Sequence, residues 1–264
     1  MSEAVVPAIR SSHQLLTRRR AGILLHITSL PGPGRVGDLG SNAYRFVDFL
    51  ASAGMSIWQI LPIGPTMHDS SPYQSSSMYA GNPRLISLEM PHERGWLEAL
   101  PPLESVITDD AKSYAIKIAW EGFKDRASEA DRADFERFSA EQGWWLEDYA
   151  LFEALRIEEK RSWWGWHKTL RDRKPQGLAM ARARLKHLIE VTKFEQYLFY
   201  TQWFSLKRYA NERGVLLFGD VPIFVAHNSA EVWAHREFFD LLEDGHPRVV
   251  AGVPPDYFSE TGQR

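Results

Sequence analysis

The sequence predicts an α/β protein whose parallel strands are separated by a long helical segment. Between residues 22 and 62, two short apolar runs flank an amphipathic helical pattern, which is typical of a strand–helix–strand unit with parallel strands. A third apolar run, at residues 215–226, follows a long stretch of charged helical pattern. The chain therefore offers three strands for a parallel sheet, with a helical insertion before the third.

The first unit is defined by its helix caps and chain breakers. Residues 22–30 (GILLHITSL) form a predicted strand that runs into the loop PGPG. Ser41 is the predicted N-cap of the next helix, which stops at Gly54. The second strand is predicted within residues 56–65 (SIWQILPIGP). The loop that leaves this strand continues to Ser87 and is rich in serine and tyrosine.

The later elements are predicted in the same way. In the helical stretch 91–184, four residues mark one apolar helix face: Trp144, Trp145, Phe152 and Leu155. We interpret the tryptophans of this stretch as core packing rather than as a ligand site. A long amphipathic helix is predicted from residue 184 to a stop at Gly214, and the third strand follows with Asp220 at its end.

Composition limits the classes of function. The 264 residues carry a formal net charge of −3 with acids and bases interleaved, so no polybasic run indicates binding to nucleic acid. There are no cysteines, which excludes disulfides, thiolate nucleophiles and cysteine-bound metals. No segment has the roughly 20 apolar residues of a membrane span, and no signal peptide is recognised. We expect a cytoplasmic protein that binds neither nucleic acid nor membrane.

The sequence indicates no cofactor site. The loop PGPGRVGDLG has prolines where a phosphate-binding loop needs free backbone N–H groups. No cluster of histidine and carboxylate residues has the spacing of metal ligands. We therefore expect no cofactor and no metal.

Functional groups of a βα architecture lie on the loops at the carboxyl ends of the strands. In the loop after the second strand, Tyr73 could stack on the apolar face of a sugar ring while Ser71, Gln74 and Asp69 reach its hydroxyls. The alternative is an ordinary polar surface loop in which Tyr73 and Tyr79 cover the rim of the sheet. Considered alone, this loop favours the second interpretation.

Asp220 directly follows the apolar part of the third strand. A carboxylate at such a place costs several kcal/mol unless partners satisfy it. It either forms a structural ion pair at the edge of the sheet or belongs to an active site, and the residues alone leave both open. We interpret His26 and His227 as structural histidines.

Four segments, in order along the chain, resemble the amylomaltases, which are 4-α-glucanotransferases of the disproportionating-enzyme type in glycoside hydrolase family 77. They are GILLHITSLPGPGRVGDLG (22–40), WQILPIGP with SPYQSSSMYAGNPRLISLE (58–89), GDVPIFVAHNSAEVW (219–233) and GVPPDYFSETGQ (252–263). The resemblance implies an incomplete (β/α)8 TIM barrel, here its first strands, with a large inserted, mainly helical subdomain. It also implies transfer of α-1,4-glucan segments between maltooligosaccharides with retention, through a covalent glycosyl-enzyme intermediate.

The resemblance assigns site residues and partners. Tyr73 matches the tyrosine that stacks on the donor sugar beside the cleaved bond, and Asp220 matches an aspartate that supports the site by hydrogen bonding and charge. Ser71 and Gln74 are further substrate-binding candidates. Three matches lie in a loop that covers the groove on the acceptor side: Asp256, Tyr257 and Phe258. The expected partners are maltooligosaccharides, or glucans derived from starch or glycogen.

The family's nucleophilic aspartate and acid/base glutamate are expected beyond Arg264, so no catalytic residue is assigned within the chain. We expect a first barrel part with an N-terminal extension (1–90), the inserted helical subdomain (91–184) and a return to the barrel that stops before closure (185–264). The expectation is an amylomaltase N-terminal half that is inactive alone and could pair through its open sheet edge. The alternatives are a noncatalytic glucan-binding module and a truncated fragment without function.

Overall fold

The computed structural model describes residues 19–32, 36–67, 69–101, 109–250, 252–257 and 259–262. Its sheet has three parallel strands in the order β1-β2-β3: Gly22–Leu24, Ile57–Gln59 and Leu216–Phe218. Ile23, Trp58 and Leu217 are paired across the sheet. The prediction of parallel strands is therefore confirmed, and β1 and β3 form the two edges of this sheet in the part of the chain that is described.

The strands are shorter than predicted. The expected strand 22–30 ends at Leu24, because the chain then turns into a 3-10 helix, η1 (Ile27–Ser29). The expected strands at 56–65 and 215–226 stop at Gln59 and Phe218. Prolines follow at 62, 65 and 222, and a proline has no N–H to donate to a ladder. The length of a strand is therefore overestimated from an apolar run when the later residues of that run leave the sheet to form the rim.

The helices follow the predicted alternation. Those described are α2 Ser41–Ser52, α3 Glu89–Glu93, α4 Asp109–Arg126, α5 Glu129–Glu141, α6 Gly143–Glu159, α7 Lys168–Arg171, α8 Pro175–Arg184, α9 Lys186–Glu212 and α10 Ala230–Ala234, with 3-10 helices η2 Pro83–Leu85, η3 Trp163–Gly165 and η4 Arg236–Phe238. The prediction of Ser41 as N-cap is wrong, because Gly40 occupies that position. Ser41 is the first helical residue, and its N–H and hydroxyl bind the Glu89 carboxylate instead.

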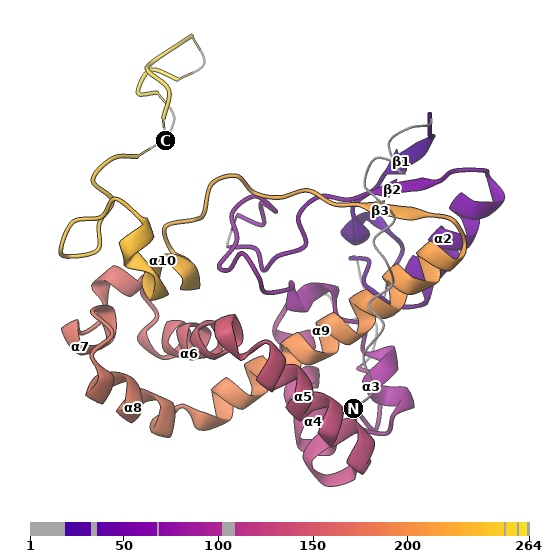
Figure 1. The fold of residues 1–264 in the computed structure, drawn as a ribbon, viewed down its shortest axis with the longest axis horizontal. Helices are drawn as coiled ribbons and strands as arrows, with labels where there is room; N and C mark the ends of the chain where they lie inside the picture. The colour runs from indigo at the N-terminus through magenta and orange to yellow at the C-terminus, as the bar shows by residue number, and fades with distance from the viewer. Residues whose placement is uncertain are drawn as a thin grey trace, which may run out of the picture.

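Two hydrophobic cores are joined by the long helix α9 (Figure 1). The first core packs the sheet against α2, α4 and most of α9, from Val191 to Ala210, with Trp58 and Leu206 fully buried. The second packs α6 against α8, α10 and the N-terminal turns of α9, around Phe152 and Trp233. Because α9 enters both cores, it fixes the helical region relative to the sheet. The division at residues 90 and 184 stays a prediction.

The interpretation of the tryptophans is confirmed for most of those in the helical stretch. Trp145, Trp163 and Trp166 are buried in the second core. Trp144 was expected on the same apolar face, and this is wrong because its side chain is 63% exposed. It lies in the first turn of α6, where its ring contacts Tyr79 from the loop after β2 rather than another helix.

Within the described ranges, none of the helices is both long enough and apolar enough to cross a membrane.

Candidate functional site

The structure brings Tyr73 and Asp220 together. The Tyr73 hydroxyl donates a hydrogen bond of 2.9 Å to Oδ2 of Asp220. Tyr73 lies in the loop that leaves β2, and Asp220 lies two residues beyond the end of β3. Because β2 and β3 are neighbouring parallel strands, their carboxyl ends meet at one rim of the sheet. The two side chains therefore meet at this rim, on segments that leave neighbouring parallel strands.

Asp220 is held in place but is not buried. Its Oδ1 accepts a hydrogen bond of 2.8 Å from the backbone N–H of Val221, and Oδ2 accepts from Tyr73. The residue is exposed, so the expected energetic cost of a buried carboxylate is not incurred. The sequence left open whether Asp220 forms a structural ion pair or belongs to an active site. Within the described residues no ion pair of Asp220 is seen, and its side-chain partner is the neutral phenol of Tyr73.

The hydrogen bond also affects the acidity of Tyr73. Its pKa is raised, first because the phenol donates to the Asp220 carboxylate, then by desolvation, and last because the negative charge of Asp220 opposes a phenolate. Tyr73 is therefore a neutral hydrogen-bond donor with an apolar ring that is 47% exposed. A neutral aromatic face beside a carboxylate suits a ligand with C–H groups on its face and hydroxyls on its rim.

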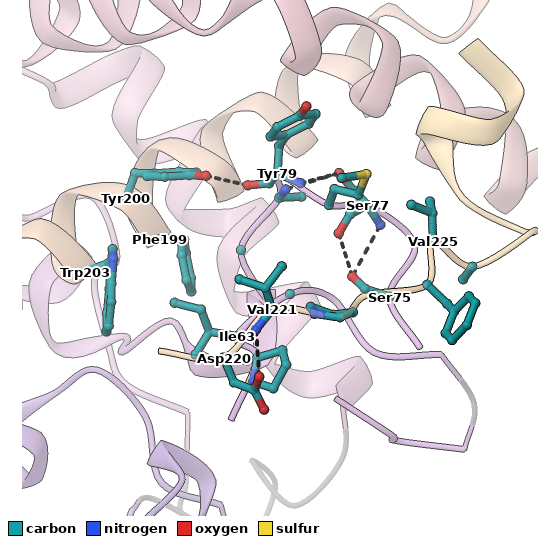
Figure 2. A pocket seen from close by; sticks show the side chains of 18 residues that line it. Ile63, Ser75, Ser77, Tyr79, Phe199, Tyr200, Trp203, Asp220, Val221 and Val225 are labelled. Atoms are coloured by element: carbon teal, nitrogen blue, oxygen red, sulfur yellow. Dashed lines mark hydrogen bonds between the residues drawn. The ribbon is translucent and has the colours of Figure 1, made fainter. Parts of the chain in front are cut away.

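A cavity of about 240 Å³ opens beside Asp220. One wall consists of three aromatic side chains of α9: Phe199, Tyr200 and Trp203. The opposite wall comes from the segments that leave β2 and β3, including Ile63, Ser75 and Val221 (Figure 2). The sequence predicts an amphipathic helix in this region, but it does not assign these aromatic side chains to the site. The aromatic run YLFYTQWF, dense on all sides of a helix, was the available signal.

Two glutamines of α9 fix the loop that lines this cavity. Both polar atoms of the Gln196 side-chain amide bind one residue: Oε1 accepts from Gly81 N–H at 2.8 Å, and Nε2 donates to Gly81 C=O at 3.0 Å. Gln202 binds Ser87 in the same way, at 2.8 Å for each bond. Both glutamines are buried, and each satisfies the backbone N–H and C=O of one loop residue, as a neighbouring strand would.

Close packing against α9 explains the glycine in this loop. A Cβ atom at Gly81 would lie 1.9 Å from the ring of Phe199. The preceding residues are also anchored, because the Tyr200 hydroxyl donates to the Tyr79 carbonyl and Ser77 Oγ donates to Glu231 at 2.6 Å (Figure 2 draws the first of these). The loop after β2 is thus a fixed wall of the site.

The other predicted site residues are less closely associated with this pair. Ser71 Oγ accepts from the backbone N–H of Tyr73 at 3.4 Å, which shapes the turn that presents the tyrosine. Gln74 is exposed in the same turn. Asp256 and Tyr257 belong to the segment that follows α10 and η4, and in Figure 1 the yellow C-terminal part of the chain lies away from the sheet. Asp256 Oδ1 accepts from Ser259 N–H at 2.8 Å, and the prediction for Phe258 lies outside the described residues.

His227 has the surroundings of a structural histidine. Its Nε2 lies 2.7 Å from the Gly245 carbonyl, and its ring stacks on Trp164 with centroids 4.1 Å apart. Burial lowers the pKa values of His26 and His227. Among the residues that the structure describes, no group of three or more histidine or acidic side chains is placed to hold a metal ion.

Comparison with known proteins identifies the family. A sequence model described as 4-alpha-glucanotransferase, of glycoside hydrolase family 77, matches residues 25–264. The chain belongs to the 4-α-glucanotransferase family. It is 48% identical over 253 residues to a 4-alpha-glucanotransferase of Thermus thermophilus, and this match covers 93% of the chain and 51% of the relative. A Synechocystis 4-alpha-glucanotransferase is 45% identical over 263 residues, with 94% and 52% covered.

Solved structures of 4-α-glucanotransferases support the fold. Amylomaltase from Streptococcus agalactiae, in complex with acarbose, superposes with a TM-score of 0.85 at 36% identity, over 93% of this chain and 52% of that one. Amylomaltase from Corynebacterium glutamicum has a TM-score of 0.64 at 20% identity, which is a likeness of fold. With its small parallel sheet and many helices, the chain has a partial (β/α)8-barrel-like fold. It spans about half the length of the curated relatives it matches.

A second, polar cavity of about 610 Å³ lies between α9, α6 and the loop after β2, and Glu195 lines it. Glu195 is partly exposed because it lines this cavity. Its carboxyl group nevertheless lies deep in the protein. Burial and then the charge of Glu153 raise its pKa to about 7, and Lys117 opposes this shift. This 4-α-glucanotransferase chain therefore carries a carboxyl group that titrates near neutrality.

Glu195→Gln should stabilise the protein at pH 8 and not at pH 5. The folded-state pKa of about 7 exceeds the ordinary value of 4.5, so the folded protein prefers the protonated carboxyl. Its contribution is fully present below the unfolded pKa and is lost as the pH rises through about 7. Between pH 5 and 8, the unfolding free energy of wild type should fall by about 1–3 kcal/mol relative to Glu195→Gln. Urea unfolding at both pH values measures this, with exposed Glu212→Gln as control, and parallel pH profiles of wild type and Glu195→Gln would contradict it.

Proposed function

We propose that this chain forms one wall of the glucan-binding groove of a 4-α-glucanotransferase, which transfers α-1,4-glucan segments between maltooligosaccharides. The observation that carries the proposal is the hydrogen bond of 2.9 Å between Tyr73 and Asp220, at the rim shared by β2 and β3. The Streptococcus agalactiae relative was solved in complex with acarbose. The proposed partners are accordingly maltooligosaccharides and glucans derived from starch or glycogen.

In the proposed site, the Tyr73 ring lies against the apolar face of the donor sugar beside the bond to be cleaved. The Asp220 carboxylate accepts hydrogen bonds from sugar hydroxyls, and the Tyr73 hydroxyl holds it in position. Ser71 and Gln74 add contacts from the same turn. Asp256, Tyr257 and Phe258 are proposed to cover the acceptor side, which requires the C-terminal tail to move toward the groove.

The proposed chemistry is retaining transfer through a covalent glycosyl-enzyme intermediate. Such a reaction uses two carboxyl groups about 5 Å apart, one as nucleophile and one as acid and then base. We propose that both come from sequence beyond Arg264, in the half of the relatives that this chain does not span. The 264-residue chain should then bind glucan without turning it over.

The domain organisation that goes with this function is also a proposal. Residues 1–90 and 185–264 would contribute to a (β/α)8 barrel, and residues 91–184 would form an inserted, mainly helical subdomain. The edge strand β3 and the segment that follows it carry exposed apolar side chains, Phe218 in the strand and Val221 and Phe224 beyond it. We propose that this open edge pairs with another chain. Sedimentation velocity tests the pairing, because a chain that stays monomeric at high concentration would contradict it. The cytoplasmic location stays a prediction.

The deciding experiment combines binding with turnover. Calorimetric titration of the 264-residue chain with maltoheptaose and acarbose should give saturable binding, and incubation with maltotriose should yield neither glucose nor longer dextrins. Binding without turnover also describes the alternative, a noncatalytic glucan-binding module. Joining the chain to the missing half of a relative separates the two, because transferase activity appears only if the groove is catalytic. No binding of either sugar would leave a fragment without function.

Two substitutions of Tyr73 distinguish the contribution of its ring to binding from that of its hydroxyl. Tyr73→Ala should weaken maltoheptaose binding about tenfold, because it removes the stacking face and the hydrogen bond to Asp220. Tyr73→Phe keeps the ring and should cost about threefold or less. Calorimetric titration measures both, with Tyr114→Ala as the control for an exposed tyrosine on α4. Equal losses for the alanine and control variants would contradict the stacking role.

A further inference from the structure

An apolar groove lies next to the Tyr73–Asp220 site and has no assigned role. It is a cavity of about 440 Å³ where the loop after β2 meets α6 and the α10–η4 segment. Three of its aromatic side chains are exposed: Tyr79 by 40%, Trp144 by 63% and Phe238 by 78%. Large aromatic side chains are normally buried or engaged with a partner, so three in one groove indicate a binding surface. We call it the Trp144 groove.

The rings of the Trp144 groove are fixed rather than loose. Tyr79 and Trp144 form an edge-to-face pair with centroids 4.6 Å apart and planes at 72°. Ser77 and Tyr200 hold the Tyr79 backbone, the first through a hydrogen bond to its N–H at 3.1 Å and the second through its carbonyl. A rigid aromatic surface binds at a low entropic cost, since little has to be ordered on binding.

The polar groups around the groove favour a neutral ligand. Asp148 forms hydrogen bonds of 2.8 and 2.9 Å with the Arg173 guanidinium, so its charge is already compensated. Glu231 is buried, and its Oε1 accepts from Ser77 Oγ. Its other oxygen, Oε2, is buried without a hydrogen-bond partner among the described residues, and a hydroxyl could supply one. A ligand with apolar faces and hydroxyl groups fits these surroundings, and a pyranose ring has both.

The groove is adjacent to the cavity beside Asp220. Met78, Tyr79 and Val225 line both cavities. A linear ligand seated against Tyr73 could therefore pass over these residues and reach Trp144. Short ligands would fill only the first cavity, and longer ones would fill both.

We propose that the Trp144 groove is a remote subsite that binds sugar units of an α-glucan chain whose other end occupies the Tyr73–Asp220 site. This inference rests on the proposed function and adds a determinant of chain length to it. The subsite gives affinity to long oligosaccharides and none to short ones. Its contacts are the faces of Trp144 and Phe238 with the sugar rings, and hydrogen bonds at the rim.

Calorimetric titration of the 264-residue chain with maltotriose and maltoheptaose tests the proposal. Wild type should bind maltoheptaose more tightly. Trp144→Ala and, independently, Phe238→Ala should each weaken maltoheptaose binding about fivefold and leave the maltotriose affinity within twofold of wild type. Tyr114→Ala, at an exposed tyrosine on α4, should change neither affinity. Both groove residues are exposed, so thermal melts of the variants should match wild type.

The results separate the two proposals. If wild type binds both sugars but Trp144→Ala and Phe238→Ala leave maltoheptaose affinity unchanged, or weaken both sugars equally, the remote subsite is wrong and the proposed function stands. Equal affinity of wild type for the two sugars would also contradict the remote subsite. The Trp144 groove would then be a surface that a protein segment covers. If wild type binds neither sugar, the proposed function fails and the subsite fails with it.

Discussion

Gln196→Ala should lower the free energy of unfolding by about 2–5 kcal/mol. The side chain is fully buried and satisfies both backbone groups of Gly81. Without it, a buried N–H and a buried C=O lose their partners, and each unsatisfied group costs about 1–3 kcal/mol. The effect should extend to ligand binding, because Gly81 lies in the loop that forms one wall of the cavity beside Asp220.

Urea unfolding, followed by circular dichroism at 222 nm, measures the loss. Gln176→Ala is a matched control, because Gln176 is exposed on α8 and the same substitution there should change stability by less than about 0.5 kcal/mol. A Gln196→Ala protein as stable as the control would mean that water or a shifted loop replaces the lost hydrogen bonds. In that case the glutamine would not be what fixes this wall.

Trp58→Ala should lower the free energy of unfolding by about 3–5 kcal/mol, the usual range for removing a buried aromatic side chain. Trp58 lies at the centre of the middle strand β2 and is fully buried. Its ring packs edge-to-face on Phe46 of α2 at 4.9 Å, and its Nε1 donates to the Leu25 carbonyl at 2.7 Å. The substitution therefore leaves a cavity between sheet and helix and removes one partner of that carbonyl.

Trp144→Ala is the control of equal size, since Trp144 is mostly exposed and its removal should change the unfolding free energy by no more than about 1 kcal/mol. Thermal and urea unfolding of both variants give the comparison. Trp58→Phe should recover part of the loss, because a smaller ring fills part of the space. Equal stabilities of Trp58→Ala and Trp144→Ala would show that the sheet core is not closely packed around β2.

Much of the fold could be predicted because it depends on short-range patterns. Apolar runs closed by glycine or proline located three strands, and the alternation with helices made them parallel. Gly54 and Gly214 stop their helices with φ of +72° and +75°, a region that glycine adopts easily. Strand lengths were overestimated, because the residues that leave the sheet to form the rim are as apolar as those within it.

The candidate site was predictable only in part. Tyr73 and Asp220 were expected at one rim because parallel strands place their carboxyl ends together, and they meet there. The aromatic wall from α9 was missed, since the sequence shows that a helix is amphipathic but not which element covers each face. Gln196 and Gln202 were missed for a related reason: a glutamine within a helix suggests a solvent-exposed position until its backbone partner is known.

The residues alone were enough to predict the family, the order of the elements and the two strand ends that carry Tyr73 and Asp220. These features depend on residue identity and local spacing, which can be read directly from the chain. The folded structure was needed to establish that Asp220 is exposed, that Trp144 lies outside the core and that α9 supplies one wall of the cavity. Each of these depends on which distant segments pack together, and burial is a property of that packing rather than of any residue's neighbours in the chain.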